Sequence, residues 1–164
     1  MKKITGDYKT AYFEALVFLN VSDLIHEKSN VRSNKKTLFG LRFAEYVNHA
    51  FAVELLIKCI LLKENGYHGN EHNLQLLFSQ LKQESQDAIN LIFTNSNLSR
   101  IGDESEIPIT VNLLLKETPS PFMSFRYNHE TGKNNKPSYH LDVLASVLKI
   151  YLLKKYKELR RIKA

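Results

Sequence analysis

The chain has 164 residues, of which 43% are hydrophobic and 24% are charged, a balance that supports one folded domain and excludes a disordered chain. Its 6 glycines and 4 prolines are too few for a turn-rich all-β fold, and its single cysteine excludes an intrachain disulfide. The net charge of +6 lies entirely in residues 149–164, where seven basic residues accompany only Glu158, while residues 1–148 carry sixteen charges of each sign. Attraction to nucleic acid or another polyanion therefore depends on the C-terminal segment.

We expect no targeting signal in the first residues. Met-Lys-Lys resembles the start of a signal peptide, but Asp7, Lys9 and Glu14 interrupt the apolar region that should follow. No apolar run approaches the roughly 20 residues needed to span a bilayer. These features predict a cytoplasmic protein with no membrane span.

The first expected helix begins near residue 7 and continues toward Leu24 and Ile25. Asp7 or Thr5 can cap its first turn, and the apolar residues that follow have helical spacing. The polar residues 27–36 then predict a loop.

A second, longer helix is expected from about Thr37 to Asn65, where the Asn-Gly pair ends it. Residues 50–62 are apolar nearly all round, so this helix should be the central and most buried element. Glu54 and Lys58 interrupt the apolar run at the spacing and in the order of an intrahelical ion pair. The pair lies either on one solvated edge or partly buried, where burial must overcome the cost of desolvation.

Shorter helices are expected over residues 74–81 and 88–93, followed by a polar loop over residues 94–107. A further helix over residues 107–115 has Pro108 in its first turn. The last helix runs from about Ser138 to the C-terminus, with Leu159 among its inward residues. The pattern predicts an all-α fold, a single helical bundle of four to five core helices that spans residues 1–164.

The segment over residues 122–130 concentrates polar groups between two breaks. Arg126 supplies a planar cation for phosphate, and His129 exchanges a proton near neutral pH. Together they are the minimum equipment for cleaving a phosphodiester with a 2′-hydroxyl nucleophile. The alternative is that Arg126 and Glu130 form a salt bridge that fixes the loop before the last helix.

Four other polar residues have simpler expected roles. Arg42 and His49 lie two turns apart on the second helix, with Arg42 expected in solvent and His49 hydrogen-bonded near the core. His72 precedes the helix at residue 74, whose first turn it can cap. His68 and His72 have a spacing that suits a metal, but glycines place them in a loop and no further ligands complete the shell. We expect no metal and no cofactor, and the absence of a phosphate-binding glycine loop and of a nucleophile elbow excludes P-loop and serine hydrolases.

Residues 149–163 form a basic, amphipathic run. Such a run binds phosphate backbones or a membrane surface, or it is the solvated end of a helix whose cations complement the helix dipole. The residues expected to bind nucleic acid are Tyr127, Lys154, Lys155, Lys157, Arg160 and Arg161.

Three stretches resemble the HEPN domains. Residues 51–66 place a Glu-x-x-x-Lys pair in a long helix that ends in glycine, and residues 72–78 are similar to the family's His-x-Leu-x-x-Leu helix start. Residues 125–130, Phe-Arg-Tyr-Asn-His-Glu, are similar to the Arg-Tyr element near the last core helix. The resemblance covers about residues 40–150, followed by the basic C-terminal end over residues 149–164.

The resemblance implies an all-α, frequently dimeric bundle. Many HEPN proteins are metal-independent endoribonucleases of defence or toxin systems, and others are non-catalytic RNA-binding or adaptor modules. In the ribonucleases a His follows an Arg after four to six residues, whereas only two residues separate Arg126 from His129; Arg42 and His49 fit the count but lie in the wrong helix. The implied catalytic residues are Arg126 and His129, and the implied structural or supporting residues are Glu54, Lys58, His72 and Glu130.

Two hypotheses follow. The first is a homodimeric HEPN-like domain that binds RNA or a nucleotide and acts as a metal-independent endoribonuclease, with an antitoxin or nucleotidyltransferase as its partner. The second is a non-catalytic dimerisation or partner-docking module, in which Arg126 and Glu130 are structural.

Overall fold

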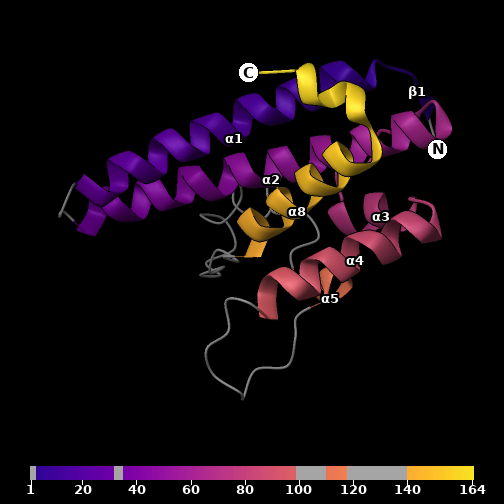
Figure 1. Ribbon diagram of the computed structural model, residues 1–164. Helices are drawn as coiled ribbons and strands as arrows, with labels where there is room; N and C mark the ends of the chain where they lie inside the picture. Colours follow the sequence, from indigo (N-terminus) through magenta and orange to yellow (C-terminus); the bar gives the residue numbers. More distant parts are fainter. Residues whose placement is uncertain (1–2, 32–34, 99–109, 118–139) are drawn as a thin grey trace.

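The computed structural model describes residues 3–31, 35–98, 110–117 and 140–164, which form helices and one small sheet (Figure 1). The predicted all-α class is confirmed, because helices make up most of this part of the chain and the sheet has two residues per strand. The elements in chain order are β1 (Lys3–Ile4), α1 (Tyr8–Val31), α2 (Lys35–Asn65), β2 (His68–Gly69), α3 (Leu74–Ser79), α4 (Gln83–Leu98), α5 (Val111–Glu117), α8 (His140–Lys155) and the short 3₁₀ helix η1 (Lys157–Arg161).

α1 begins where the sequence predicted it. The Asp7 carboxylate accepts hydrogen bonds from the backbone N–H groups of Lys9 and Thr10, both at 3.1 Å. These bonds satisfy N–H groups that the first turn of a helix leaves free. The bond from Lys9 in particular lowers the pKa of Asp7. Asp7, of the two expected residues, is therefore the cap.

α1 and α2 form a long antiparallel hairpin, and the predicted loop over residues 27–36 is wrong for most of its length. α1 continues to Val31 and α2 starts at Lys35. Polar contacts join the two helices just before this stretch: Ser22 donates to the Glu45 carbonyl at 3.3 Å, and His26 Nδ1 lies 3.1 Å from Glu45 Oε1. Local polarity suggested a loop, but the described residues of this stretch continue two helices that pair with each other.

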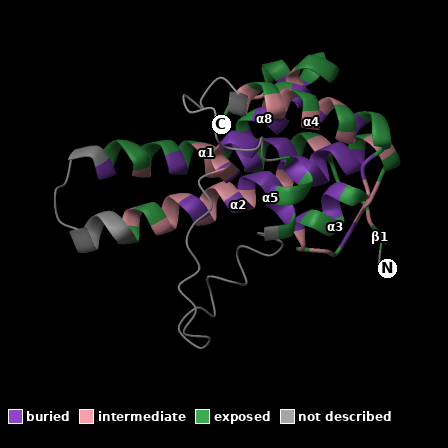
Figure 2. Cartoon of the chain, turned by 90° about the horizontal axis from the view of Figure 1, so that it is seen from below, coloured by how far each residue is buried: buried purple, intermediate pink, exposed green. Residues whose placement is uncertain are grey.

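α2 is the central helix, as predicted. It contacts α1, α3, α8 and β2, and Figure 2 shows its buried residues in the middle of the bundle, whereas the far ends of α1 and α2 extend beyond it. It ends at Asn65 because Gly66 takes the left-handed conformation, with φ 77°, and donates to the Leu62 carbonyl at 2.9 Å. The least exposed residues of α2 are Ala52, Val53, Leu56, Ile57, Cys59, Ile60 and Leu61.

The shorter helices differ from the prediction mainly in their bounds. α3 falls within the predicted range, but α4 runs from Gln83 to Leu98 and takes in the first residues of the predicted loop over 94–107. Ile89 and Phe93 are fully buried on one face of α4, which packs on α8. This packing stabilises a helix that is longer than the predicted residues 88–93 in both directions. α5 starts at Val111, later than the predicted residue 107; Pro108 lies outside the described residues.

The last helix does not reach the C-terminus, contrary to the prediction. α8 ends at Lys155, Tyr156 is not helical, and η1 follows (Figure 1). The change of direction keeps Leu159 fully buried in the core. It also brings Glu158 to the start of α1, where it accepts from the Tyr8 hydroxyl. The basic segment is therefore two elements set at an angle and not one amphipathic helix.

Candidate nucleic-acid interface

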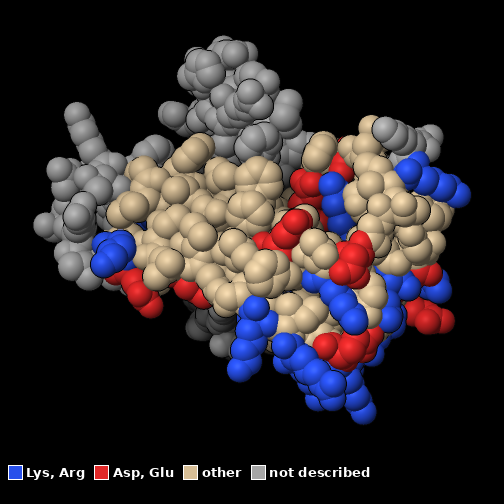
Figure 3. Space-filling view, turned by 90° about the horizontal axis from the view of Figure 1, so that it is seen from above, with Lys and Arg blue, Asp and Glu red and all other residues tan. Residues whose placement is uncertain are grey.

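The basic residues near the C-terminus form one exposed surface. Lys154 lies in the last turn of α8, Lys157, Arg160 and Arg161 lie on η1, and all four are exposed. Figure 3 shows Lys and Arg side chains gathered along the lower edge of the molecule, where α8 and η1 lie. We call the following residues the C-terminal basic surface: Lys149, Lys154, Lys157, Arg160, Arg161 and Lys163.

The one acidic residue of this segment is held by other parts of the fold. Glu158 Oε1 accepts from Lys63 Nζ at 2.9 Å and from the Tyr8 hydroxyl at 3.1 Å. The bond from Lys63 is the main reason that the pKa of Glu158 falls to about 2. Among the described acidic residues, none forms an ion pair with the C-terminal basic surface. Its positive charge is therefore available to an anionic ligand.

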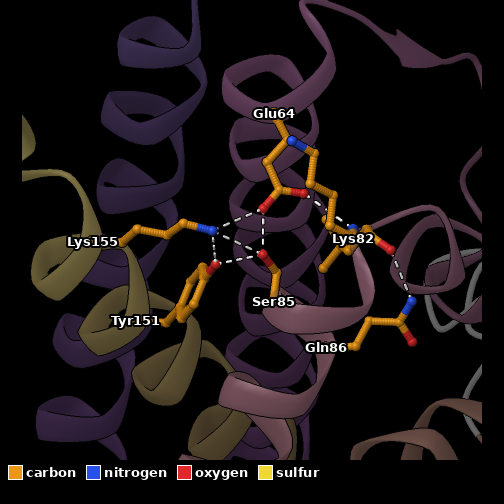
Figure 4. A network of polar contacts seen from close by, with 7 residues as sticks. Glu64, Lys82, Ser85, Gln86, Tyr151 and Lys155 are labelled. Atoms are coloured by element: carbon orange, nitrogen blue, oxygen red, sulfur yellow. Dashed lines mark hydrogen bonds and ion pairs between the residues drawn. The ribbon is translucent and has the colours of Figure 1, made fainter.

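Lys155 was expected to bind nucleic acid; its side chain is 38% exposed, but its ammonium group is directed toward partners on α2, α4 and α8 (Figure 4). Nζ lies 2.6 Å from the Tyr151 hydroxyl, 3.0 Å from Ser85 Oγ and 3.1 Å from Glu64 Oε1. An ammonium group has three N–H donors, so these partners occupy all of them. Partial burial opposes the charged form, but the bonds to Tyr151 and Glu64 outweigh it and raise the pKa of Lys155.

Glu64 is the buried centre of this arrangement, with a side chain only 3% exposed. Its carboxylate accepts from Ser85 Oγ and, at 3.1 Å, from the Lys82 backbone N–H. Burial raises the pKa of Glu64, but these bonds and Lys155 lower it further than burial raises it. We call Glu64, Ser85, Tyr151 and Lys155 the Glu64–Lys155 network; it joins α2, α4 and α8.

The sequence did not indicate the roles of Glu64, Ser85 and Tyr151. These residues come from three helices and are separated by up to 87 positions, so no local pattern connects them. The spacing of four between Tyr151 and Lys155, which places both on one face of α8, was the only local indication.

A groove of about 370 Å³ lies between α1, α8 and the C-terminal residues. Its apolar lining includes Leu16, Leu153 and Ile162, and three cations, Lys149, Arg160 and Lys163, line it too. No Asp or Glu is among the described residues that line it. The groove therefore combines an apolar floor with positive charge.

Glu54 and Lys58 form a partly buried pair, which settles the alternative left open by the sequence. Their side chains are 12% and 10% exposed, and Lys58 Nζ donates to Glu54 Oε1 at 2.7 Å. His72 Nδ1 lies 2.9 Å from the same oxygen, although its ring is mostly exposed. The expected capping role of His72 is wrong, because Asn73 Oδ1 accepts from the Leu76 N–H at 3.0 Å and so caps α3. These three residues tie the loop before α3 to α2.

Arg42 is exposed, as predicted, and His49 is half buried. Burial lowers the pKa of His49. The negative charges of Asp142 and Glu45 raise this pKa, but by less than burial lowers it.

The expected catalytic residues Arg126 and His129 lie outside the described residues, as do Tyr127 and Glu130. Their roles stay predictions. Within the described ranges, no group of three or more His, Cys, Asp or Glu side chains is placed to hold a metal ion. No helix of the described part is both long and apolar enough to cross a membrane.

Comparison of the chain with protein-family models, with curated proteins and with solved structures gave no match. The HEPN resemblance therefore depends on the motifs quoted above and stays a prediction.

Proposed function

We propose that this chain is an HEPN-like helical domain that binds RNA or a nucleotide through the C-terminal basic surface. The observation that supports binding is the set of exposed cations on the end of α8 and on η1, which form no ion pair with a described acidic residue. When protein cations contact RNA phosphates, they release the counterions condensed there, and this release increases the affinity of the protein for RNA. The affinity therefore falls steeply as the salt concentration rises. We leave Lys155 out of this surface, because its three N–H donors are taken up by Tyr151, Ser85 and Glu64.

The test is the salt dependence of binding to a single-stranded RNA. The double variant Lys154→Gln, Lys157→Gln removes two cations of the surface, and the slope of log K against log salt should become shallower by about 1.4, since each cation contributes roughly 0.7 on a single strand. The matched control is Lys28→Gln, Lys116→Gln, two exposed lysines on α1 and α5. Equal slopes for both double variants, or no binding by the unmodified protein at low salt, would refute the proposal.

The proposal extends to metal-independent RNA cleavage in a defence or toxin–antitoxin system. The sequence motif supports it: Arg126 would hold the scissile phosphate and His129 would move a proton. Labelled RNA should be cut in the presence of a chelator, and Arg126→Ala and His129→Ala should each lower cleavage at least about 100-fold while binding persists. Arg42→Ala, at an exposed position on α2, is the control. Binding without cleavage in the unmodified protein would leave a non-catalytic RNA-binding domain.

The second candidate is a dimerisation module, and an exposed apolar stripe on α1 favours it. Phe13, Val17, Val21 and Leu24 are between 37% and 58% exposed, and their spacing places them on one face of the helix, opposite the face that packs on α2. Apolar residues that share a solvent-facing stripe commonly mark an interaction site. The expected occupant is a second copy of this chain.

A further inference from the structure

The groove between α1, α8 and the C-terminal residues has the chemistry of a nucleotide site. Its volume of about 370 Å³ is at the low end of the range of about 300–1,000 Å³ that ligand pockets occupy, which suits one nucleotide and not a longer segment. A groove lined by both apolar and cationic side chains favours a ligand that has an apolar part and a negative charge. A bare anion makes no favourable contact with the apolar floor, and an uncharged apolar ligand is not attracted by the cations.

Arg160 is held in a position to bind a phosphate. Its Nε donates to the Leu153 carbonyl at 3.0 Å, which fixes the plane of the guanidinium group against α8. No hydrogen bond joins its two terminal amino groups to another described residue. A guanidinium group anchored at Nε presents those groups as a fork, the geometry in which arginine binds phosphate oxygens in pairs. Lys149 and Lys163 line the same groove and add positive charge.

Cations outside the groove indicate that its ligand belongs to a longer chain of phosphates. Lys154, Lys157 and Arg161 are exposed beside it and do not line it. A lipid anion with a single charged head would use only the groove, whereas an RNA strand has further phosphates that reach the neighbouring cations.

We propose that the groove binds one nucleotide of the RNA, with the phosphate on Arg160, Lys149 and Lys163 and the base on the apolar floor of Leu16, Leu153 and Ile162. This proposal rests on the RNA-binding function proposed above. It adds a defined binding site for one base, which electrostatic attraction to a basic surface does not provide.

The test is calorimetric titration of the full chain with adenosine monophosphate, ribose 5-phosphate and inorganic phosphate. The nucleotide should bind at least about fivefold more tightly than ribose 5-phosphate, because only the nucleotide has a base to cover the apolar floor. Arg160→Gln should weaken nucleotide binding about tenfold through the loss of charge-assisted hydrogen bonds. Arg42→Gln is the matched control, since Arg42 is exposed on α2 and lies outside both the groove and the C-terminal basic surface; it should change nucleotide binding less than about twofold. Ile162→Ser, which keeps the charge, should remove the preference for the nucleotide over ribose 5-phosphate.

Three outcomes would overturn the proposal. Equal affinities for the nucleotide and ribose 5-phosphate would show that the groove holds no base, and equal effects of Arg160→Gln and Arg42→Gln would show that the groove has no special role. Displacement of the nucleotide by oleate at lower concentration than by RNA would make the occupant a lipid anion. If RNA binds with the expected salt dependence while any of these results is obtained, the groove proposal fails and the RNA-binding function stands; if RNA does not bind at all, the function itself fails.

Discussion

Lys154 and Lys155 are adjacent in the sequence, but their ammonium groups have different surroundings. Successive residues of a helix point about 100° apart. Lys154 is exposed, whereas Lys155 contacts Glu64 on α2 and Ser85 on α4. Their position in the basic C-terminal run predicted that both bind nucleic acid. The packing of α8 against α2 and α4 separates them, and only the fold determines that packing.

Ser85 should be a stability residue of the Glu64–Lys155 network. Its hydroxyl donates to Glu64 and accepts from Tyr151, at 2.6 Å, and from Lys155. Ser85→Ala removes the acceptor of the buried Tyr151 hydroxyl and one partner each from Glu64 and Lys155, so we expect it to lower the free energy of unfolding by about 1–3 kcal/mol. Urea denaturation measures this loss. The control Ser146→Ala, at an exposed position of α8, should change stability by less than about 0.5 kcal/mol; similar losses at the two sites would contradict the proposed role of the network.

Glu64 should make part of the stability dependent on pH. Its pKa is lower in the folded chain than the ordinary value of 4.5, so its contribution is present above that pH and is lost as pH falls through the folded pKa. Denaturation curves of the unmodified protein and of Glu64→Gln should therefore differ at pH 7 and converge well below pH 4.5. Glu14→Gln, an exposed position on α1, is the control and should follow the unmodified protein at every pH. A constant difference between the protein and Glu64→Gln across this range would exclude the carboxylate as its source.

At the scale of elements, the ends of helices were predictable where one residue determines them. Asp7 supplies acceptors to the first turn of α1, and Gly66 adopts a left-handed conformation that other residues rarely take. Both effects operate within four residues of the chain. The end of α8 at Lys155 was not predicted, because it depends on the burial of Leu159 in the core by the following η1.

Gly40, inside α2, and Gly66, directly after it, give opposite predictions. At Gly66 a Cβ would meet no atom within 4 Å, so Gly66→Ala is opposed by the positive φ alone and should destabilise the protein by about 1–2 kcal/mol. At Gly40, inside the helix, a Cβ also meets nothing within 4 Å, and Gly40→Ala should stabilise the protein by about 0.5–1 kcal/mol. Thermal unfolding of the two variants checks both signs. Equal signs would show that the conformation of Gly66 does not control its response.

For the whole molecule, the stripe on α1 determines the expected state of assembly. Leu24, the most exposed of its four residues, is 58% exposed. If two copies pair through this stripe, Leu24→Glu buries a charge at the interface and should convert a dimer to a monomer. Light scattering gives the mass. The control Leu91→Glu changes a leucine that is 64% exposed on α4 and should leave the dimer intact. A monomeric unmodified protein, or a dimeric Leu24→Glu variant, would exclude this interface.

The sequence by itself determined the all-α class, the central position of α2, the cap at Asp7, the end at Gly66 and the location of the net charge. Each of these follows from the spacing of apolar residues, from backbone geometry near one residue or from composition, all of which act locally. Only the tertiary structure decided that Glu54 and Lys58 are partly buried, that His72 lies beside them and that Lys155 faces inward. It also set η1 at an angle to α8, which creates the groove. These features depend on contacts between residues far apart in the chain, and such contacts leave no pattern in the sequence of any one helix.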